Sequence, residues 1–215
     1  MPKTLNIDIV SDVSCPWCVI GYHSLRIALD RLLPDIEANI RWHPFELNPV
    51  MPAEGQDVSE HLAQKYGMND AQLQQSREHI AQRGLQVGYA FGERGGGRIY
   101  NTFNAHRLLH WAAEEAKQTP LKLALFDLYF KQRGNPSDAQ QLLAVVAAVG
   151  LDVNRAAQIL DSDEYAQPVR HAQAQYQQLG ISAVPAFIIN QRHLISGGQP
   201  PEVFEQALRE LSLSA

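Results

Sequence analysis

Two cysteines near the start of the chain are the residues most able to do chemistry in this sequence. They stand in the segment Cys15-Pro16-Trp17-Cys18 and are the only cysteines among 215 residues. Two thiols at this spacing can form a disulfide with each other and so exchange electrons with other thiols. The same spacing also occurs in metal sites and in structural disulfides. The rest of the sequence has to separate these three kinds of site.

The metal and structural alternatives find little support elsewhere in the chain. A structural zinc site takes four ligands, and no further cysteine is available to complete a set. His106 and His110 are four residues apart on an expected helix, but such a pair is more often a helix face with one core histidine. A permanent disulfide across two residues would close too small a loop to constrain the unfolded chain. We therefore expect a redox-active pair and no metal.

The pattern around the cysteines predicts a strand that leads into a helix. Residues 5–10 alternate between apolar and polar, and from Pro16 apolar residues recur at helical spacing until Pro34. Because proline suits the first turn of a helix, Cys15 is expected at the helix N-terminus. The free N–H groups and the helix dipole there favour a thiolate, which predicts a lowered pKa for Cys15. Cys15 would then attack, and Cys18, one turn later, would resolve the mixed disulfide.

The remaining elements predict a split domain with a helical insertion. A strand over 39–47 completes a βαβ unit, and after Gly180 an apolar strand, a hairpin turn at Asn190-Gln191 and a final amphipathic helix follow. Between them the spacing predicts helices over 58–66, 71–83, 102–117, 121–132, 139–149, 153–160 and 165–179. We therefore expect one domain from residues 1–50 and 180–215, and an inserted helical domain over 51–179.

A second signal is the proline directly before the apolar strand at 186–190. Proline removes a hydrogen-bond donor from a sheet, which makes this position awkward. A cis bond between Val184 and Pro185 would turn the chain so that the backbone before it stays free for a passing peptide. On this segment alone, an ordinary trans proline at a strand start is favoured.

Taken together, these features resemble the DsbA-like branch of the thioredoxin fold, and within it the FrnE-type group. The segments that carry the resemblance are SDVSCPWCVIG from Ser11, PFELNP from Pro44, NTFNAHRLLHWA from Asn101 and GISAVPAFIIN from Gly180. The resemblance covers essentially the whole chain. It implies an α/β thioredoxin fold with a large inserted helical domain, and a redox-active disulfide without a tightly bound cofactor.

The resemblance also assigns roles to residues. Cys15 matches the nucleophile and Cys18 the resolving thiol, while Pro185 matches a cis-proline that faces the cysteines. The substrate-binding residues that it implies are Pro16, Trp17, Val184, Pro185, Asn101 and His106. For Asn101 and His106 a local explanation is also open, namely a capping asparagine and a core histidine.

The same larger family contains a different chemistry. It includes glutathione-dependent 2-hydroxychromene-2-carboxylate isomerases and kappa-class glutathione transferases, in which a serine generally replaces the nucleophilic cysteine. Both cysteines are present here, so thiol–disulfide exchange with a protein or small-molecule thiol is favoured. Glutathione stays open as a ligand or reductant. A non-catalytic binding or chaperone module is the third alternative.

Composition narrows the partners further. Charged residues make up 19% of the chain, and the formal net charge is −5. This balance argues against a surface for nucleic acid or anionic membranes. No stretch approaches the roughly 20 apolar residues of a membrane span, and the N-terminus alternates as a strand does, so we expect a cytoplasmic protein. If the glycine-rich loop at 92–98 covers the site, Arg94 or Arg98 could meet an anionic substrate.

Overall fold

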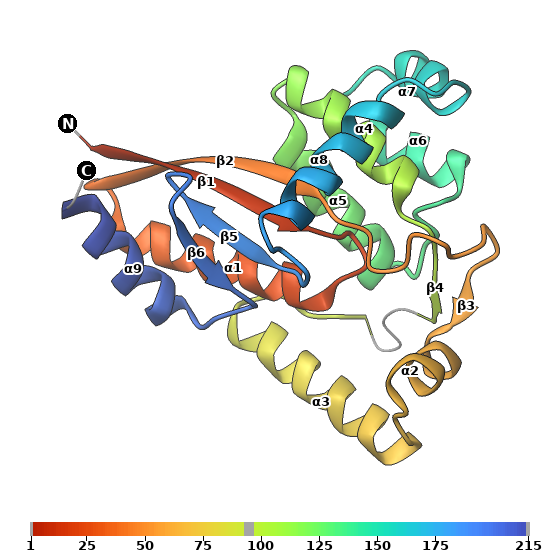
Figure 1. The fold of residues 1–215 in the computed structure, drawn as a ribbon, viewed down its shortest axis with the longest axis horizontal. Helices are drawn as coiled ribbons and strands as arrows, with labels where there is room; N and C mark the ends of the chain where they lie inside the picture. The colour runs from red at the N-terminus through yellow and green to blue at the C-terminus, as the bar shows by residue number, and fades with distance from the viewer. Residues whose placement is uncertain (1, 93–96, 214–215) are drawn as a thin grey trace.

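A four-stranded mixed sheet forms the centre of the molecule in a computed structural model that describes residues 2–92 and 97–213. The strand order is β2-β1-β5-β6, with β1 parallel to β2 and the other two pairings antiparallel. The strands are β1 Lys3–Ser11, β2 Ile36–Pro44, β5 Ala186–Ile189 and β6 His193–Ser196. The first βαβ unit and the closing β-hairpin and helix therefore build one sheet, as expected (Figure 1).

Helices cover both faces of this sheet. On one face, α1 (Pro16–Leu32) packs against α9 (Pro201–Leu213), and Phe187 of β5 meets Phe204 of α9 with ring centroids 4.7 Å apart. On the other face lies α8 (Ala166–Gln178), whose Tyr176 ring is 4.7 Å from His43 of β2. Because β1 is covered on both sides, most of its second half is buried.

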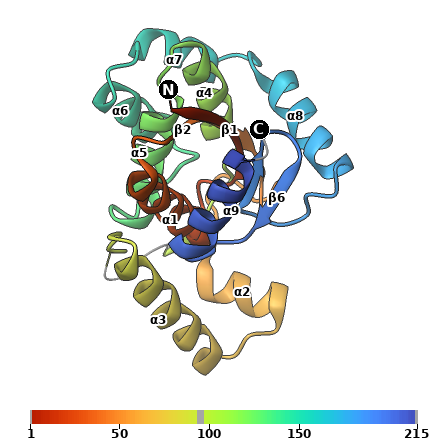
Figure 2. The same cartoon turned by 90° about the vertical axis from the view of Figure 1, so that its left-hand side faces the viewer.

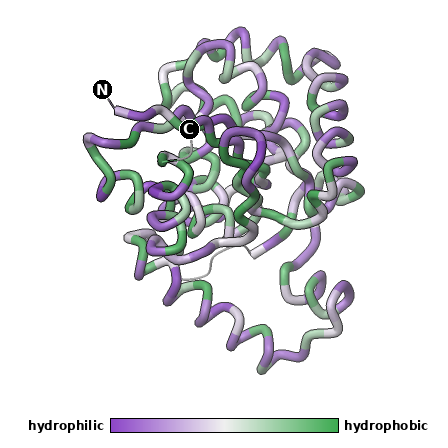
Figure 3. Tube along the Cα trace, turned by 60° about the vertical axis from the view of Figure 1, so that its left-hand side comes forward, coloured by the Kyte–Doolittle hydropathy of each residue, from purple (hydrophilic) through white to green (hydrophobic). Residues whose placement is uncertain are grey.

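The inserted residues form a compact helical group and a separate arm. The group consists of α4 Phe103–Glu114, α5 Gln118–Phe130, α6 Ala139–Ala148 and α7 Val153–Leu160, which share an apolar core. The arm consists of α2 Val58–Tyr66 and α3 Asp70–Gln86, and both views show it projecting away from the α4–α7 group (Figures 1 and 2), while α3 contacts α1. Hydrophilic and hydrophobic stretches alternate along the arm in Figure 3, and α2 buries none of its residues.

The helical group is fastened to the sheet at Trp42 of β2. The side-chain amide of Gln118 accepts a hydrogen bond from the Trp42 backbone N–H and donates one to its carbonyl, each at 2.9 Å. The indole N–H donates to Thr119 Oγ1, also at 2.9 Å. The Trp42 ring packs between Tyr22 of α1 and Phe126 of α5. The backbone and the indole of Trp42 thus both hold the start of α5 in place.

Most element predictions are confirmed, and two need correction. The second strand spans Ile36–Pro44 instead of 39–47, since its register with β1 ends at Ser11 opposite Pro44 and the Leu47 N–H turns to the Asp12 carboxylate. The insertion also contains a small two-stranded sheet, β3 Gln56–Asp57 and β4 Arg98–Ile99, where no strand was predicted. Two residues a strand give too little alternation to be recognised in a sequence.

The glycine-rich loop at 92–98 is only partly described by the structure. Arg94 lies outside the described residues, and the Arg98 guanidinium donates to the backbone carbonyls of Glu54 and Gly55. Arg98 therefore holds the base of the arm, which gives its charge a local structural role. Among the residues that the structure describes, no helix has the length and apolar character needed to cross a bilayer.

The contact between α1 and β5 depends on a glycine. A Cβ at Gly21 would lie 2.9 Å from Phe187 Cζ and 3.3 Å from Gly198 Cα. We expect Gly21→Val to lower the free energy of unfolding by about 1–3 kcal/mol, because the added atoms overpack a buried contact. Urea denaturation of both proteins measures the loss.

The same substitution at Gly97 is the matched control, since an added Cβ there meets nothing within 4 Å among the residues that the structure describes. Its midpoint should stay close to that of the wild type. Equal midpoints for Gly21→Val and the wild type would contradict the close approach of α1 to β5.

Candidate active site

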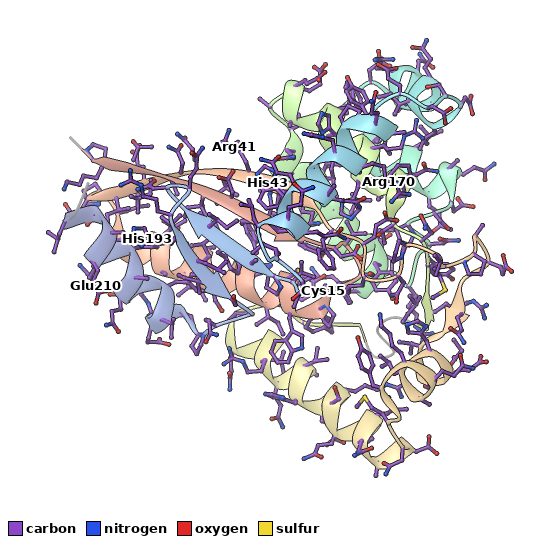
Figure 4. All side chains as sticks on the ribbon, in the orientation of Figure 1. Cys15, Arg41, His43, Arg170, His193 and Glu210 are labelled. Carbon is purple, nitrogen blue, oxygen red and sulfur yellow. The ribbon has the colours of Figure 1, made fainter. Side chains whose placement is uncertain are left out.

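Cys15 lies where the sequence predicts it, at the N-terminus of α1. It is the N-cap residue, with φ −94° and ψ 113°, and Pro16 follows in the first turn. Its side chain faces the loop before β5, where Cys15 Sγ is 3.6 Å from the Val184 carbonyl oxygen. The Val184–Pro185 peptide bond is cis, the geometry that the family resemblance implies and the segment alone does not favour. Figure 4 labels Cys15 at the end of α1 nearest to the helical group.

Both cysteines are free thiols in this structure, and they differ in access. Cys15 is 4% exposed, whereas Cys18 is completely buried. An external sulfur can therefore meet Cys15 first. Cys18 sits one turn into α1, and its backbone N–H donates to the Cys15 carbonyl at 3.1 Å. This arrangement gives Cys15 the outer and Cys18 the inner position of the pair.

The charges around the thiols favour a thiolate on Cys18. The pKa of Cys15 is raised well above its ordinary value by its hydrogen bond with Cys18, by burial and by the nearby Asp12 carboxylate. Burial also acts to raise the pKa of Cys18, but the hydrogen bond from Cys15, the Lys122 ammonium and Ser11 outweigh it, so that this pKa is lowered. The predicted low pKa of Cys15 is therefore wrong for the dithiol state.

The single proton on Cys15 has two acceptors within its surroundings. It can donate to the Val184 carbonyl or to the sulfur of Cys18, but only to one at a time. The Ser11 hydroxyl is buried and has no hydrogen-bond partner within the described part of the chain. A negative charge on Cys18 would give this hydroxyl an acceptor.

A buried carboxylate lies directly beneath the pair. Asp12 is 1% exposed; its carboxylate accepts a hydrogen bond from the Leu47 backbone N–H at 2.8 Å and lies 3.5 Å from His106 Nε2. Burial would raise the pKa of Asp12, but His106, Leu47 and Lys122 together lower it. Asp12 therefore keeps a negative charge close to both thiols.

A buried lysine from the insertion completes the charged group. Lys122 of α5 is 1% exposed, and its Nζ lies 5.3 Å from the ring centroid of Trp42 and 5.0 Å from that of Phe126. Burial lowers the pKa of Lys122 to about 8, while Cys18, Asp12 and Cys15 act in the opposite direction. The thiols thus lie between one buried anion and one buried cation.

The remaining residues suggested by the resemblance fall into two groups. Pro16, Trp17 and Val184 are half-buried at the rim, and Pro185 is buried behind Val184. The Trp17 ring contacts His79 of α3, with centroids 5.4 Å apart. These residues surround Cys15 from α1, the α2–α3 arm and the loop before β5.

Asn101 and His106 instead make contacts inside the protein. His106 is 3% exposed, and its Nε2 is 2.9 Å from the Phe45 carbonyl. Asn101 Oδ1 accepts a hydrogen bond from the Phe103 N–H at the start of α4, and its amide group donates to the Pro49 carbonyl. Both residues hold the loop after β2, and His106 reaches the cysteines only through Asp12.

Sequence reasoning missed Asp12 and Lys122. Asp12 lies three residues before Cys15, at the end of a buried strand, and Lys122 is a charged residue in an otherwise apolar helical stretch, Leu121 to Phe126. A charge in such a stretch is a usable signal, because buried charges are rarely left without partners. Among the described residues no group of three or more histidine, cysteine or acidic side chains is arranged to hold a metal ion.

Comparison with known proteins decides the family. The model of the DsbA-like thioredoxin domain matches residues 6–209. The chain belongs to the DsbA-like thioredoxin family. A probable DsbA oxidoreductase from Streptomyces coelicolor is 31% identical, with a TM-score of 0.90 over 98% of this chain and 90% of that one. This DsbA-like chain therefore has the thioredoxin-like DsbA fold, a mixed sheet with a large helical content.

Two more distant structures share the fold of this DsbA-like chain. The cytosolic disulfide reductase DsbM from Pseudomonas aeruginosa, solved with GSH, is 16% identical with a TM-score of 0.67, over 98% of this chain and all of that one. A 2-hydroxychromene-2-carboxylate isomerase is 15% identical with a TM-score of 0.69, over 96% and 95%. At these identities the likeness concerns the fold alone.

The buried carboxylate makes stability depend on pH. Because the pKa of Asp12 in the folded protein is lowered from its ordinary 3.8, its charge stabilises the fold above that value, and the stabilisation is lost as pH falls through the lower folded pKa. We expect Asp12→Asn to lower the free energy of unfolding at neutral pH by about 1–3 kcal/mol. Urea denaturation at a series of pH values should show this difference shrinking in acid.

Asp30→Asn is the matched control, because Asp30 is exposed and pairs only with Arg26 one turn away. It should change stability by less than about 0.5 kcal/mol. A difference between Asp12→Asn and the wild type that stays constant into acid would show that the Asp12 charge is not stabilised by folding.

Proposed function

We propose that this DsbA-like protein catalyses thiol–disulfide exchange through Cys15 and Cys18. The observation that carries the proposal is the outer and inner arrangement of its two cysteines at the start of α1, with Cys15 Sγ facing the Val184 carbonyl. Family membership makes oxidoreductase chemistry the expected class. The assignment to the FrnE-type group within the family depends on the sequence motifs.

The reaction begins at the outer cysteine. A thiolate on Cys18 can take the proton of Cys15, since the two are hydrogen-bonded. The resulting Cys15 thiolate attacks one sulfur of a substrate disulfide. A bond forms between Cys15 Sγ and that sulfur, the substrate S–S bond breaks, and the second substrate sulfur leaves as a thiolate that is protonated by water.

The inner cysteine completes the reaction. Cys18 loses its proton again and attacks Cys15 Sγ, which forms the Cys15–Cys18 disulfide and releases the first substrate sulfur. Two electrons have then passed from the protein to the substrate. The reverse sequence oxidises a substrate dithiol, and the direction depends on the reduction potential of the partner.

The rim residues are proposed to contact the substrate. Pro16 and Trp17 flank the attacking sulfur, and Val184 with Pro185 lies opposite, so a thiol or disulfide that reaches Cys15 must pass between them. Asn101 and His106 would act on the substrate only indirectly, through the loop after β2. No tightly bound cofactor is needed for this chemistry, because the electrons reside in the cysteine pair.

The proposal extends to partners, compartment and domains. We take glutathione as a candidate reductant and the cytoplasm as the compartment, because a related fold is a cytosolic disulfide reductase solved with GSH. We divide the chain into a thioredoxin-like domain, residues 1–50 and 180–215, and an inserted domain, residues 51–179. The two parts share one apolar core, in which Phe126 and Phe130 of the insertion pack with β1 and α1.

A glutathione-dependent isomerase or transferase is the alternative. A 2-hydroxychromene-2-carboxylate isomerase shares the fold at 15% identity. In such an enzyme the thiol of glutathione reacts, so a serine at position 15 should be compatible with activity. In the proposed oxidoreductase the same serine should abolish activity.

Equilibration in glutathione redox buffers tests the proposal. With free thiols trapped at each ratio, the wild type should show one reversible two-electron transition between dithiol and disulfide. Cys15→Ser should show no transition. Cys18→Ser should instead accumulate a mixed disulfide between Cys15 and glutathione, detected by mass, because the resolving thiol is missing.

The two serine variants are matched controls for each other, since each removes one sulfur from the same helix turn. A wild type that forms no reversible Cys15–Cys18 disulfide would overturn the proposal. Glutathione-dependent isomerisation that survives in Cys15→Ser would move the assignment to the alternative.

A further inference from the structure

Lys122 is a buried cation that the exchange reaction described above does not use. Among the described residues its side chain is the first of the largest fully buried side chains, and it is 1% exposed. Burying an ammonium group costs several kcal/mol unless other groups compensate for it. Within the described ranges no hydrogen bond is recorded for the Lys122 ammonium, so the rings of Trp42 and Phe126 and nearby anions have to compensate for its burial.

The position of Lys122 is fixed by the contact between the insertion and the sheet. Gln118 and Thr119 are hydrogen-bonded to Trp42, and Lys122 follows Gln118 by four residues on the same helix face. The Trp42 ring therefore lies against Lys122, and the same tryptophan is hydrogen-bonded to the start of α5, the helix that carries Lys122. Trp42 also contacts Tyr22, one turn beyond Cys18 on α1. Cys18, Trp42 and Phe126 belong to one buried core cluster, so the Lys122 ammonium lies in the same part of the interior as the inner cysteine.

The groups that surround Cys18 come from four elements. They are Ser11 of β1, Asp12 of the loop after it, Cys15 at the start of α1 and Lys122 of α5. His106 of α4 and Tyr129 of α5 interact with Asp12 and so act on Cys18 only indirectly. The charged member that favours an anion on Cys18 is Lys122, whereas Asp12 opposes an anion on Cys15.

We propose that Lys122 is a positioning residue that holds the negative charge on Cys18 while Cys18 resolves the mixed disulfide. The inference rests on the proposed exchange reaction. Cys18 gives its proton to water and its electron pair to a new bond with Cys15 Sγ. The bond between Cys15 and the substrate sulfur breaks, and its electron pair leaves with the substrate thiolate. The charged Lys122 stabilises the Cys18 thiolate before the attack.

The substitution Lys122→Met tests this role, because methionine keeps the length of the side chain and removes its charge. The thiolate absorbance of the reduced protein should titrate about one pH unit higher than in the wild type. Release of glutathione from the mixed disulfide at Cys15 should slow by about tenfold near neutral pH, in proportion to the lost thiolate fraction. Lys131→Met, at the exposed C-terminal end of the same helix, should change neither value.

The outcomes separate this inference from the proposed function. A wild type without a reversible disulfide would refute the exchange reaction itself. A reversible wild type, combined with an unchanged titration and an unchanged release rate in Lys122→Met, would refute the role of Lys122 alone.

A measurement on the wild type covers the case in which Lys122→Met does not fold. The titration of Lys122, followed by NMR, should move to lower pH when the Cys15–Cys18 disulfide forms, because the disulfide carries no charge to hold the ammonium. An identical Lys122 titration in the reduced and oxidised proteins would overturn the inference.

Discussion

The hydrogen bonds between Trp42 and the start of α5 are the constraint on which the site depends. The thioredoxin-like strands and α1 bring the cysteines to the end of β1, but the groups beneath them come largely from the insertion. His106 arrives on α4 and Lys122 on α5, and both helices reach the sheet at β2. Because the Gln118 amide is hydrogen-bonded to the backbone of Trp42, the position of α5 along β2 is fixed.

The helical insertion therefore also supplies a charged group that acts on the cysteine pair. A thiol pair at a helix N-terminus has some preference for an anion on its own. Here two buried charges act on the pair: the Asp12 carboxylate opposes an anion on Cys15, and the Lys122 ammonium favours one on Cys18. The pKa of the inner cysteine thus depends on a contact between two parts of the chain, α1 and α5, that are about a hundred residues apart in sequence.

The sequence predicts well the features of local structure that depend on residues close together in the chain. Pro16 marks the helix start, the alternation up to Val10 marks the strand, and Asn190-Gln191 forms the expected hairpin turn, with positive φ at both residues. Prediction from the sequence fails for features that depend on residues far apart in the chain. The strand at 36–44 stops early because Asp12 takes the Leu47 N–H, and the pKa of Cys15 rises because Cys18 and Asp12 face it. Lys122 looks like a surface lysine until the fold is known.

The same contact at Trp42 has a consequence for association. A strand at the edge of a sheet can pair with another chain through its outward backbone groups. At β2 the side chain of Gln118 already occupies the N–H and carbonyl of Trp42, and at β6 the side chain of Gln199 occupies the Ser196 carbonyl at 2.8 Å. Two glutamines, one at each border strand, thereby discourage strand-to-strand polymerisation in crowded solution.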